Sequence, residues 1–296
     1  MSFANAFMSA KVGAARTLLV VGIGAGLAAC DTVSALNPFD RAERYEMELV
    51  EQTPAPALYN EGLAQLRSGD SNGAVETFGR LEREYPSSQW ARRALVMKAY
   101  SQYESRAFDD AISSAQTYLR RHPDTPEAAY AQYIIGVSYF DQIPDIARDQ
   151  DRTARAIVEL EAVIERYPRS EYVADARAKL NMAYDQLAGA EMQVGRFYLE
   201  RRNYTGAINR FRNVVAHYQR TRHVEEALSR LTEAYYAMGI VDEAQTAAAV
   251  LGHNFPDSPW YRDAYALLQT GGLEPRENRG SWISRAFVDF VRAVGI

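Results

Sequence analysis

Small, apolar and polar residues recur along the chain in a pattern typical of paired antiparallel helices. Four junctions share the same order, namely an aromatic residue or histidine, then proline, any residue, and serine or threonine. They lie at residues 85–88, 122–125, 167–170 and 255–258. Proline ends a helix because it lacks an N–H group and disfavours helical geometry in the residue before it. The serine or threonine is a favourable N-cap for the next helix. Each junction therefore predicts the end of one helix and the start of another.

Small residues mark the points where the two helices of a pair would cross. An alanine stands twelve residues before each junction proline, at Ala74, Ala111, Ala156 and Ala244. A second small residue precedes an alanine by twelve positions in three pairs, Gly62/Ala74, Ala99/Ala111 and Gly195/Ala207. This recurring spacing resembles the tetratricopeptide (TPR) repeat, in which small residues let two helices pack closely. We count five units, at about 56–86, 88–123, 125–168, 170–219 and 222–256. No strand-like alternation competes, so we expect an all-α superhelical solenoid of five TPR-like helix pairs with a short C-terminal helix.

The units differ in length. The third carries an insertion around residues 141–151, and the fourth begins with a long helical region, 171–200, with an expected break near residues 188–189. A further helix is predicted at about 259–268, followed by a linker rich in glycine and proline at 271–280. Ser281 then caps an amphipathic segment, 282–294, whose apolar face is formed by Ile283, Phe287, Phe290, Val291 and Val294. Such a face must pack on this solenoid or on a partner.

The first thirty residues have the features of a secretory signal. Two bases, Lys11 and Arg16, precede an apolar run at 18–29, which is short of the about 20 residues that span a bilayer. The sequence Leu27-Ala28-Ala29-Cys30 resembles the lipobox of bacterial lipoproteins. That resemblance implies cleavage of residues 1–29 and acylation of Cys30, which would be the lipid attachment site. The alternative is a plain signal peptide with a buried cysteine. Residues 30–55 are interpreted as a tether with a short helix at 41–50.

The amino-acid composition and the motif content exclude several kinds of functional site. The chain has one cysteine and four histidines, so a disulfide scaffold and a multi-thiolate metal site are excluded. We find none of the sequence motifs typical of hydrolases, zinc proteases or nucleotide-binding loops. The acidic insertion lacks the central glycine and the glutamate of a calcium loop. We therefore expect no catalytic residue, no metal and no cofactor, and we expect that the protein is not an enzyme.

Net charge is a poor guide to partners. The whole chain carries −5, and loss of residues 1–29 gives −7 (31 minus 38). Within residues 195–222, however, seven arginines face one acid, Glu200, which is a local charge of +6. A solvated helix face is the simplest explanation, but arginine is also favoured at interfaces with carboxylates. The predicted partner-binding residues here are Arg196, Arg201, Arg202, Arg210 and Arg212.

The TPR register predicts a second surface. Positions on the first helix of each unit that face the concave side are rich in aromatic residues in units one to three. These candidate groove residues are Tyr59, Tyr100, Tyr103, Tyr130, Tyr133 and Phe140. In unit four the same positions are Met192, Arg196 and Leu199. Aromatic side chains suit an extended apolar or aromatic peptide, and the alternative is that they form the core between repeats.

The lipobox, the tether and five lengthened units together resemble the BamD family, lipoprotein subunits of the β-barrel assembly complex of Gram-negative outer membranes. The likeness covers about residues 30–268 and includes three local motifs, Asp149-Gln150-Asp151-Arg152, Tyr167-Pro168-Arg169-Ser170-Glu171-Tyr172 and Phe197-Tyr198-Leu199-Glu200-Arg201. It implies a non-enzymatic scaffold, lipid-anchored at the periplasmic face of the outer membrane. Its implied partners are a BamA-like barrel protein, other assembly lipoproteins and nascent β-barrel proteins. A periplasmic location disfavours nucleic acid.

The resemblance also divides the chain into regions. Residues 56–168, units one to three, would face substrate, and residues 169–268, units four and five, would dock partners. Arg201 falls at the family position linked to BamA contact, and residues 269–296 form the linker and amphipathic C-terminal helix. The alternative function is a periplasmic TPR adaptor or chaperone that coordinates peptidoglycan enzymes.

Overall fold

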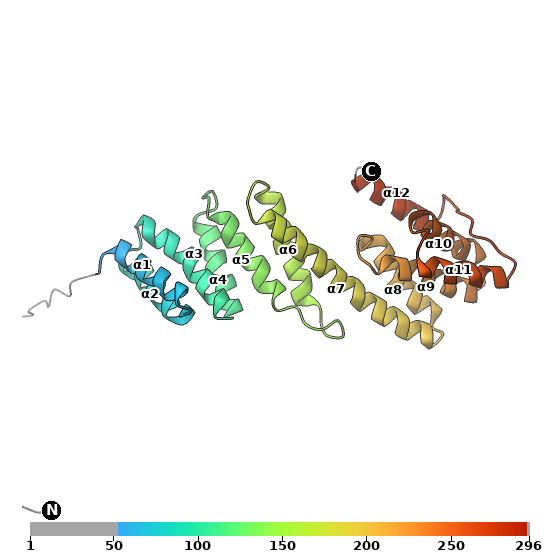
Figure 1. Ribbon diagram of the computed structural model, residues 1–296, viewed down its shortest axis with the longest axis horizontal. Helices are drawn as coiled ribbons and strands as arrows, with labels where there is room; N and C mark the ends of the chain where they lie inside the picture. The colour runs from blue at the N-terminus through green and yellow to red at the C-terminus, as the bar shows by residue number, and fades with distance from the viewer. Residues whose placement is uncertain (1–52, 295–296) are drawn as a thin grey trace, which may run out of the picture. The chain divides into compact units, whose positions relative to one another are not determined.

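The computed structural model describes residues 53–294, with side chains to residue 288. Cys30 and the predicted helix at 41–50 lie outside the described residues. The described part contains twelve helices and no strand. Figure 1 shows them following one another as antiparallel pairs. Their bounds are α1 Ala55–Arg67, α2 Ser71–Glu84, α3 Gln89–Glu104, α4 Phe108–Arg121, α5 Ala128–Phe140, α6 Asp151–Arg166, α7 Val173–Glu200, α8 Tyr204–His217, α9 Val224–Ala237, α10 Val241–Asn254, α11 Pro259–Thr270 and α12 Trp282–Val294. The predicted all-α solenoid of five helix pairs is confirmed.

The small residues do lie where paired helices cross. A Cβ atom on Gly62 of α1 would come within 2.6 Å of the Phe78 ring on α2, and one on Gly195 of α7 within 2.4 Å of the Phe211 ring on α8. Phe78 and Phe211 are fully buried. At these two crossings a glycine on the first helix packs against a phenylalanine on the second, and a Cβ atom on Gly136 of α5 would likewise meet Leu160 of α6 at 2.8 Å. Close contact with a large side chain is the packing reason for a small residue at these positions.

The turns inside four pairs repeat the same backbone geometry. Two residues after each of α1, α3, α7 and α9, the chain adopts a positive φ, +83° at Gly69, +62° at Arg106, +59° at Arg202 and +73° at Gly239. Glycine adopts this left-handed conformation at little cost, whereas other residues pay about 1 kcal/mol or more. Arg106 and Arg202 thus occupy positions that favour glycine.

The expected break near residues 188–189 is wrong. α7 runs without interruption for 28 residues, and both Ala188 and Gly189 are buried. A Cβ atom on Gly189 would meet His223 Nε2 at 3.4 Å and Ile146 at 3.6 Å. The small residues allow the start of α9 and the insertion loop to approach α7. They serve packing and do not interrupt the helix.

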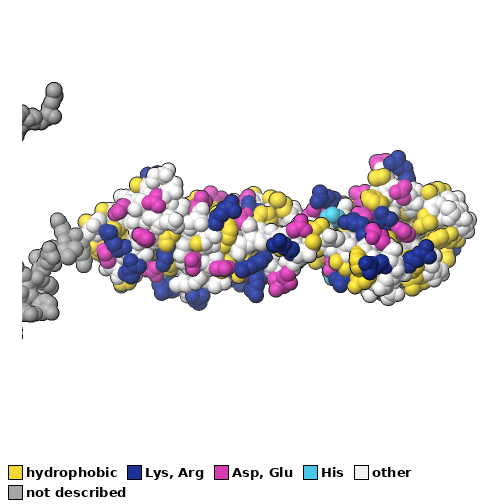
Figure 2. Space-filling model, turned by 90° about the horizontal axis from the view of Figure 1, so that it is seen from below, with side chains coloured by type: hydrophobic (Ala, Val, Ile, Leu, Met, Phe, Trp, Pro, Cys, Tyr) yellow, Lys and Arg dark blue, Asp and Glu magenta, His cyan; other side chains and the backbone are white. Residues whose placement is uncertain are grey.

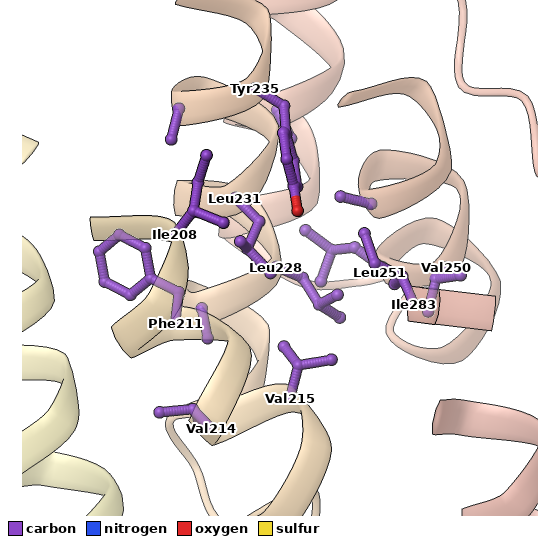
Figure 3. Close-up of a cluster of buried hydrophobic side chains, with 14 of the residues drawn as sticks. Ile208, Phe211, Val214, Val215, Leu228, Leu231, Tyr235, Val250, Leu251 and Ile283 are labelled. Atoms are coloured by element: carbon purple, nitrogen blue, oxygen red, sulfur yellow. The ribbon is translucent and has the colours of Figure 1, made fainter. Parts of the chain in front are cut away.

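Helix α12 packs on the solenoid through the part of its apolar face that the structure describes. Ile283 and Phe287 are buried, Phe287 lies edge-on to Phe255, and α12 contacts α8 and α10. Ser281 accepts a hydrogen bond from the backbone N–H of Ile283 at 3.1 Å, as expected of a cap. Figure 3 shows Ile283 among the buried side chains of α8, α9 and α10. Phe290, Val291 and Val294 lie beyond the described side chains.

Candidate functional site

Three of the six predicted groove residues, Tyr100, Tyr130 and Tyr133, form a connected aromatic row together with Tyr172, which was not predicted. Rings of Tyr100 and Tyr130 lie 6.0 Å apart between centroids, and Tyr130 stacks on Tyr172 at 5.0 Å. Tyr172 also stacks on Tyr133 at 5.0 Å. The sequence interpretation missed Tyr172 as a groove residue, although it stands in the motif at 167–172. It precedes the first residue of α7, so no helical register predicted its direction.

A cavity of about 620 Å³ opens beside this row. Tyr130, Tyr167 and Tyr172 supply its aromatic wall, and polar side chains including Glu127, Arg166 and Arg169 complete its lining. The tyrosines are half-buried, because their bases pack on the helix core while their edges stay accessible. We call this surface the tyrosine groove, defined by Tyr100, Tyr130, Tyr133 and Tyr172.

Three of the predicted groove residues stand outside the stacked row. Tyr59 packs against Phe78 and Trp90 at the N-terminal end of the solenoid. The Tyr103 hydroxyl donates a hydrogen bond to Asp141 at 2.6 Å, and Phe140 lies 5.7 Å from the Lys179 ammonium. Met192 and Leu199, predicted to face the concave side, are instead buried in the core. The reason is that α8 packs directly over this part of α7.

Burial and hydrogen bonding keep the groove hydroxyls protonated. Burial, with a hydrogen bond to Asp175, raises the pKa of Tyr133, and burial raises the pKa of Tyr130. Burial also tends to raise the pKa of Asp175, but hydrogen bonds from Lys179 and Tyr133 more than offset it and hold that pKa below its usual range. The Tyr133 hydroxyl is committed to Asp175, whereas the Tyr130 hydroxyl is a neutral donor beside the aromatic faces, which suits a peptide carbonyl and aromatic side chains.

Tyr133→Phe tests this hydrogen bond to Asp175 through its pH dependence. We expect the free energy of unfolding to fall by about 0.5–1 kcal/mol at pH 7, because one partly exposed hydrogen bond to a carboxylate is lost. The folded-state pKa of Asp175 lies below its unfolded value near 3.9. The stabilisation is therefore present above about pH 4 and is lost as the pH falls through the folded-state pKa. Urea unfolding of both proteins at pH 7 and pH 3 measures it, and a pH-independent difference would contradict the assignment.

The five predicted partner-binding arginines divide into two groups. Arg196 pairs with Glu226 at 2.7 Å, Arg210 pairs with Glu191 at 3.3 Å, and the Arg212 guanidinium lies 4.9 Å from the centroid of the Trp282 ring of α12. These three are engaged within the chain. Arg201 and Arg202 are exposed, and no ion pair involves them within residues 53–294. Their role in partner binding stays a prediction.

Arg201 is held beside exposed apolar residues at the end of α7. Its guanidinium lies 4.1 Å from the centroid of the Phe197 ring, and Phe197 is 48% exposed. A neighbouring cavity of about 490 Å³ is lined by Phe197, Val194 and Arg210, and on its other side by residues 146–148 of the insertion loop. We call Val194, Phe197 and Arg201 the α7 end surface. It combines a cation with an apolar face, a composition typical of interface centres. Figure 2 shows Lys and Arg interspersed with acidic and apolar side chains along one face of the molecule.

Arg202 occupies a turn position that favours glycine, and Arg202→Gly tests whether the arginine is there because it binds a partner. We expect the free energy of unfolding to change by less than about 1 kcal/mol, because relief of the positive φ is offset by the freedom that glycine gains in the unfolded chain. Binding at the α7 end should weaken, because a cation is lost. The matched control is Arg106→Gly, which changes the equivalent turn. Its partner binding should stay at the wild-type level, so equal binding by both variants would contradict a role for Arg202.

Comparison with known proteins identifies similar chains over most of the sequence. A family model described as outer membrane lipoprotein, YfiO, matches residues 51–251. The outer membrane protein assembly factor BamD of Caulobacter vibrioides is 44% identical over 225 residues, which cover 76% of this chain and 74% of that protein. The BamD proteins of Rickettsia prowazekii and Neisseria meningitidis serogroup A are 38% and 31% identical, over 73% and 84% of this chain and 86% and 95% of theirs.

Solved structures with TPR folds are also similar. The TPR2AB domain of yeast Sti1 in its pHSP90 complex matches at 13% identity with a TM-score of 0.39, over 73% of this chain and 83% of that chain. No helix within residues 53–294 combines the length and the apolar character needed to cross a bilayer.

Proposed function

The chain belongs to the YfiO family of outer membrane lipoproteins and is an outer membrane protein assembly factor, and we propose that it acts in this assembly as a non-enzymatic scaffold. In this proposal one end of α7 holds the barrel subunit of the assembly complex, and the tyrosine groove receives unfolded barrel proteins. TPR assembly factors are typically non-catalytic. The sequence holds none of the motifs typical of hydrolases, zinc proteases or nucleotide-binding loops, which supports the same view.

The α7 end surface is the proposed contact for a BamA-like barrel protein. One observation carries this proposal, namely that Arg201 lies over an exposed Phe197 ring and has no ion pair in the described part of the chain. A partner carboxylate would meet an oriented guanidinium, and an apolar partner residue would cover Phe197 and Val194. Stacking holds the guanidinium plane in place, which lowers the entropy lost on binding.

The tyrosine groove is the proposed site for nascent barrel proteins. Segments of such proteins alternate apolar and polar side chains and are extended before they fold. The half-buried tyrosine edges would contact aromatic side chains of an extended segment, and the Tyr130 hydroxyl would donate to one of its main-chain carbonyls. The charged residues at the cavity edge, Glu127, Arg166 and Arg169, leave the site tolerant of varied polar residues.

Membrane attachment is proposed to pass through acylated Cys30. This residue lies outside the described residues, and the lipobox sequence at 27–30 supports the assignment. One acyl chain binds a bilayer only marginally, so several chains on one residue would be needed for stable anchoring. The chain would then extend from the periplasmic face of the outer membrane, where other assembly lipoproteins would join it.

Depletion of the protein in living cells tests the proposed function. We expect the folded barrel proteins of the outer membrane to fall several-fold before cell-wall synthesis changes, because their assembly factor is missing. Heat-modifiable mobility on gels reports the folded fraction, and incorporation of labelled muropeptides reports cell-wall synthesis. Unchanged barrel levels with altered cell-wall synthesis would favour the alternative, a TPR adaptor of peptidoglycan enzymes.

A further inference from the structure

A notch lies along the first half of α7, between α6 and the turn that joins α8 to α9. The first half of α7 packs on α6, where Ala176 meets Leu160 and Val163, and the second half packs on α8, where Met192 lies in the same core as Phe211. One long helix, α7, packs first on α6 and then on α8, so these two neighbouring helices contact different stretches of it (Figure 1). A cavity of about 450 Å³ remains between them.

The floor of the notch is aromatic. Tyr184 and Tyr218 lie there with ring centroids 6.1 Å apart, and Leu180 adds an aliphatic side chain. Each of the three is half-buried. The floor therefore presents an apolar surface that is wide enough for one aromatic or aliphatic side chain and is distinct from the tyrosine groove in every residue.

The edges of the notch are mainly basic. Arg177, His217 and Arg220 line it together with a single acid, Glu161. The Arg177 side chain makes no ion pair or hydrogen bond within residues 53–294. The carboxylate of Glu161 is already engaged, because the Tyr184 hydroxyl donates a hydrogen bond to it. Two guanidinium groups thus face a site whose one carboxylate is satisfied by its neighbour.

The C-terminal helix fixes one wall of the notch. Gln219, which lines the notch, donates a hydrogen bond from Nε2 to the backbone carbonyl of Ala286 in α12 at 3.1 Å. Thr221 in the same turn is buried and donates to the Tyr218 carbonyl at 2.8 Å. The wall is therefore held in place before any ligand arrives, which reduces the ordering cost of binding.

We propose that this notch binds an extended acidic segment of a partner protein, in which a carboxylate stands next to an aromatic or aliphatic side chain. The apolar side chain packs on Tyr184, Tyr218 and Leu180, and the carboxylate faces Arg177 and Arg220. The apolar floor favours a peptide over a simple anion, since an anion would gain nothing from it. This site adds a second docking point to the scaffold and does not depend on contact at the α7 end.

Peptide binding to the full-length, detergent-purified protein tests the proposal. The probe is a fluorescein-labelled twelve-residue peptide with a Glu-Phe-Glu centre in a Gly/Ser background, and its charge-neutral match has Gln-Phe-Gln. We expect fluorescence anisotropy to show at least fivefold tighter binding of the acidic peptide. Arg177→Glu should weaken that binding about fivefold or more, since it reverses one charge of the site.

A variant that binds the peptide more tightly would show that the changes in binding reflect recognition and not misfolding of the protein. Glu161→Gln removes the one acid that lines the notch, so we expect the acidic peptide to bind about threefold more tightly. The control is Arg262→Glu, an exposed residue of α11, which should leave binding unchanged. Equal binding of both peptides, or equal binding by the Arg177 and Arg262 variants, overturns the proposal. It is also wrong if phosphatidylglycerol vesicles bind with a dependence on Arg177 while the acidic peptide does not bind.

Discussion

Replacing Arg201 with glutamate is expected to reduce recovery of the barrel subunit with this protein at least tenfold. The guanidinium is exposed, stacked on Phe197 at 4.1 Å, and without an ion pair in the described part of the chain, so it is free to meet a partner carboxylate. Reversing a charge at such a contact costs about 2–5 kcal/mol of binding free energy. Quantitative mass spectrometry of the complex, purified in mild detergent through a tag on this chain, measures the recovery.

The same substitution should leave the fold intact. Because the Arg201 side chain makes no buried contact within residues 53–294, the free energy of unfolding should change by less than about 0.5 kcal/mol. Arg155→Glu, at an exposed position on α6, is the matched control and should recover the barrel subunit at the wild-type level. Equal recovery by the two variants would refute the assignment of Arg201.

Replacing Phe211 with alanine is expected to lower the free energy of unfolding by about 3–5 kcal/mol. The Phe211 ring is 0% exposed and fills the space over Gly195 that a Cβ atom would occupy. Its removal leaves a cavity at the crossing of α7 and α8, within the core cluster drawn in Figure 3. Chemical denaturation followed by circular dichroism measures the loss.

Phe197→Ala provides the comparison for this stability prediction. Phe197 lies on α7 but is 48% exposed, so its truncation should cost less than about 1 kcal/mol of unfolding free energy. Recovery of the barrel subunit should nevertheless fall, because Arg201 loses the ring on which it stacks. If Phe197→Ala destabilised the protein as much as Phe211→Ala, Phe197 would belong to the core and the α7 end surface would lose its apolar half.

The repeat pattern was readable in the sequence because helix crossing constrains residue size. A glycine opposite a phenylalanine leaves a fixed spacing along the chain, as at Gly62 and Gly195. The same reasoning failed at residues 188–189, where small residues admit His223 and Ile146 from elsewhere in the fold. A glycine in a sequence does not reveal whether it interrupts a helix or admits a neighbour.

The binding surfaces were only partly readable. The five predicted arginines lie close together in the sequence and have identical side chains. The contacts that distinguish them can come from residues far away along the chain. Arg212 lies over the ring of Trp282, seventy positions away, whereas Arg201 lies over the ring of Phe197 in its own helix. Tyr172 was missed for a related reason, since its stacking on Tyr130 depends on how α7 leaves the preceding junction.

Site-specific photo-crosslinking in intact cells tests the central claim most directly, because it reads both proposed surfaces of one scaffold in the same measurement. A photoreactive residue at position 197 should crosslink to the barrel subunit, and one at position 130 should crosslink to unfolded barrel proteins during their synthesis. Each adduct is identified by mass spectrometry of the crosslinked peptides. Crosslinks from both positions to the same protein, or to peptidoglycan enzymes only, would contradict a scaffold that holds the barrel subunit and its substrates on separate surfaces.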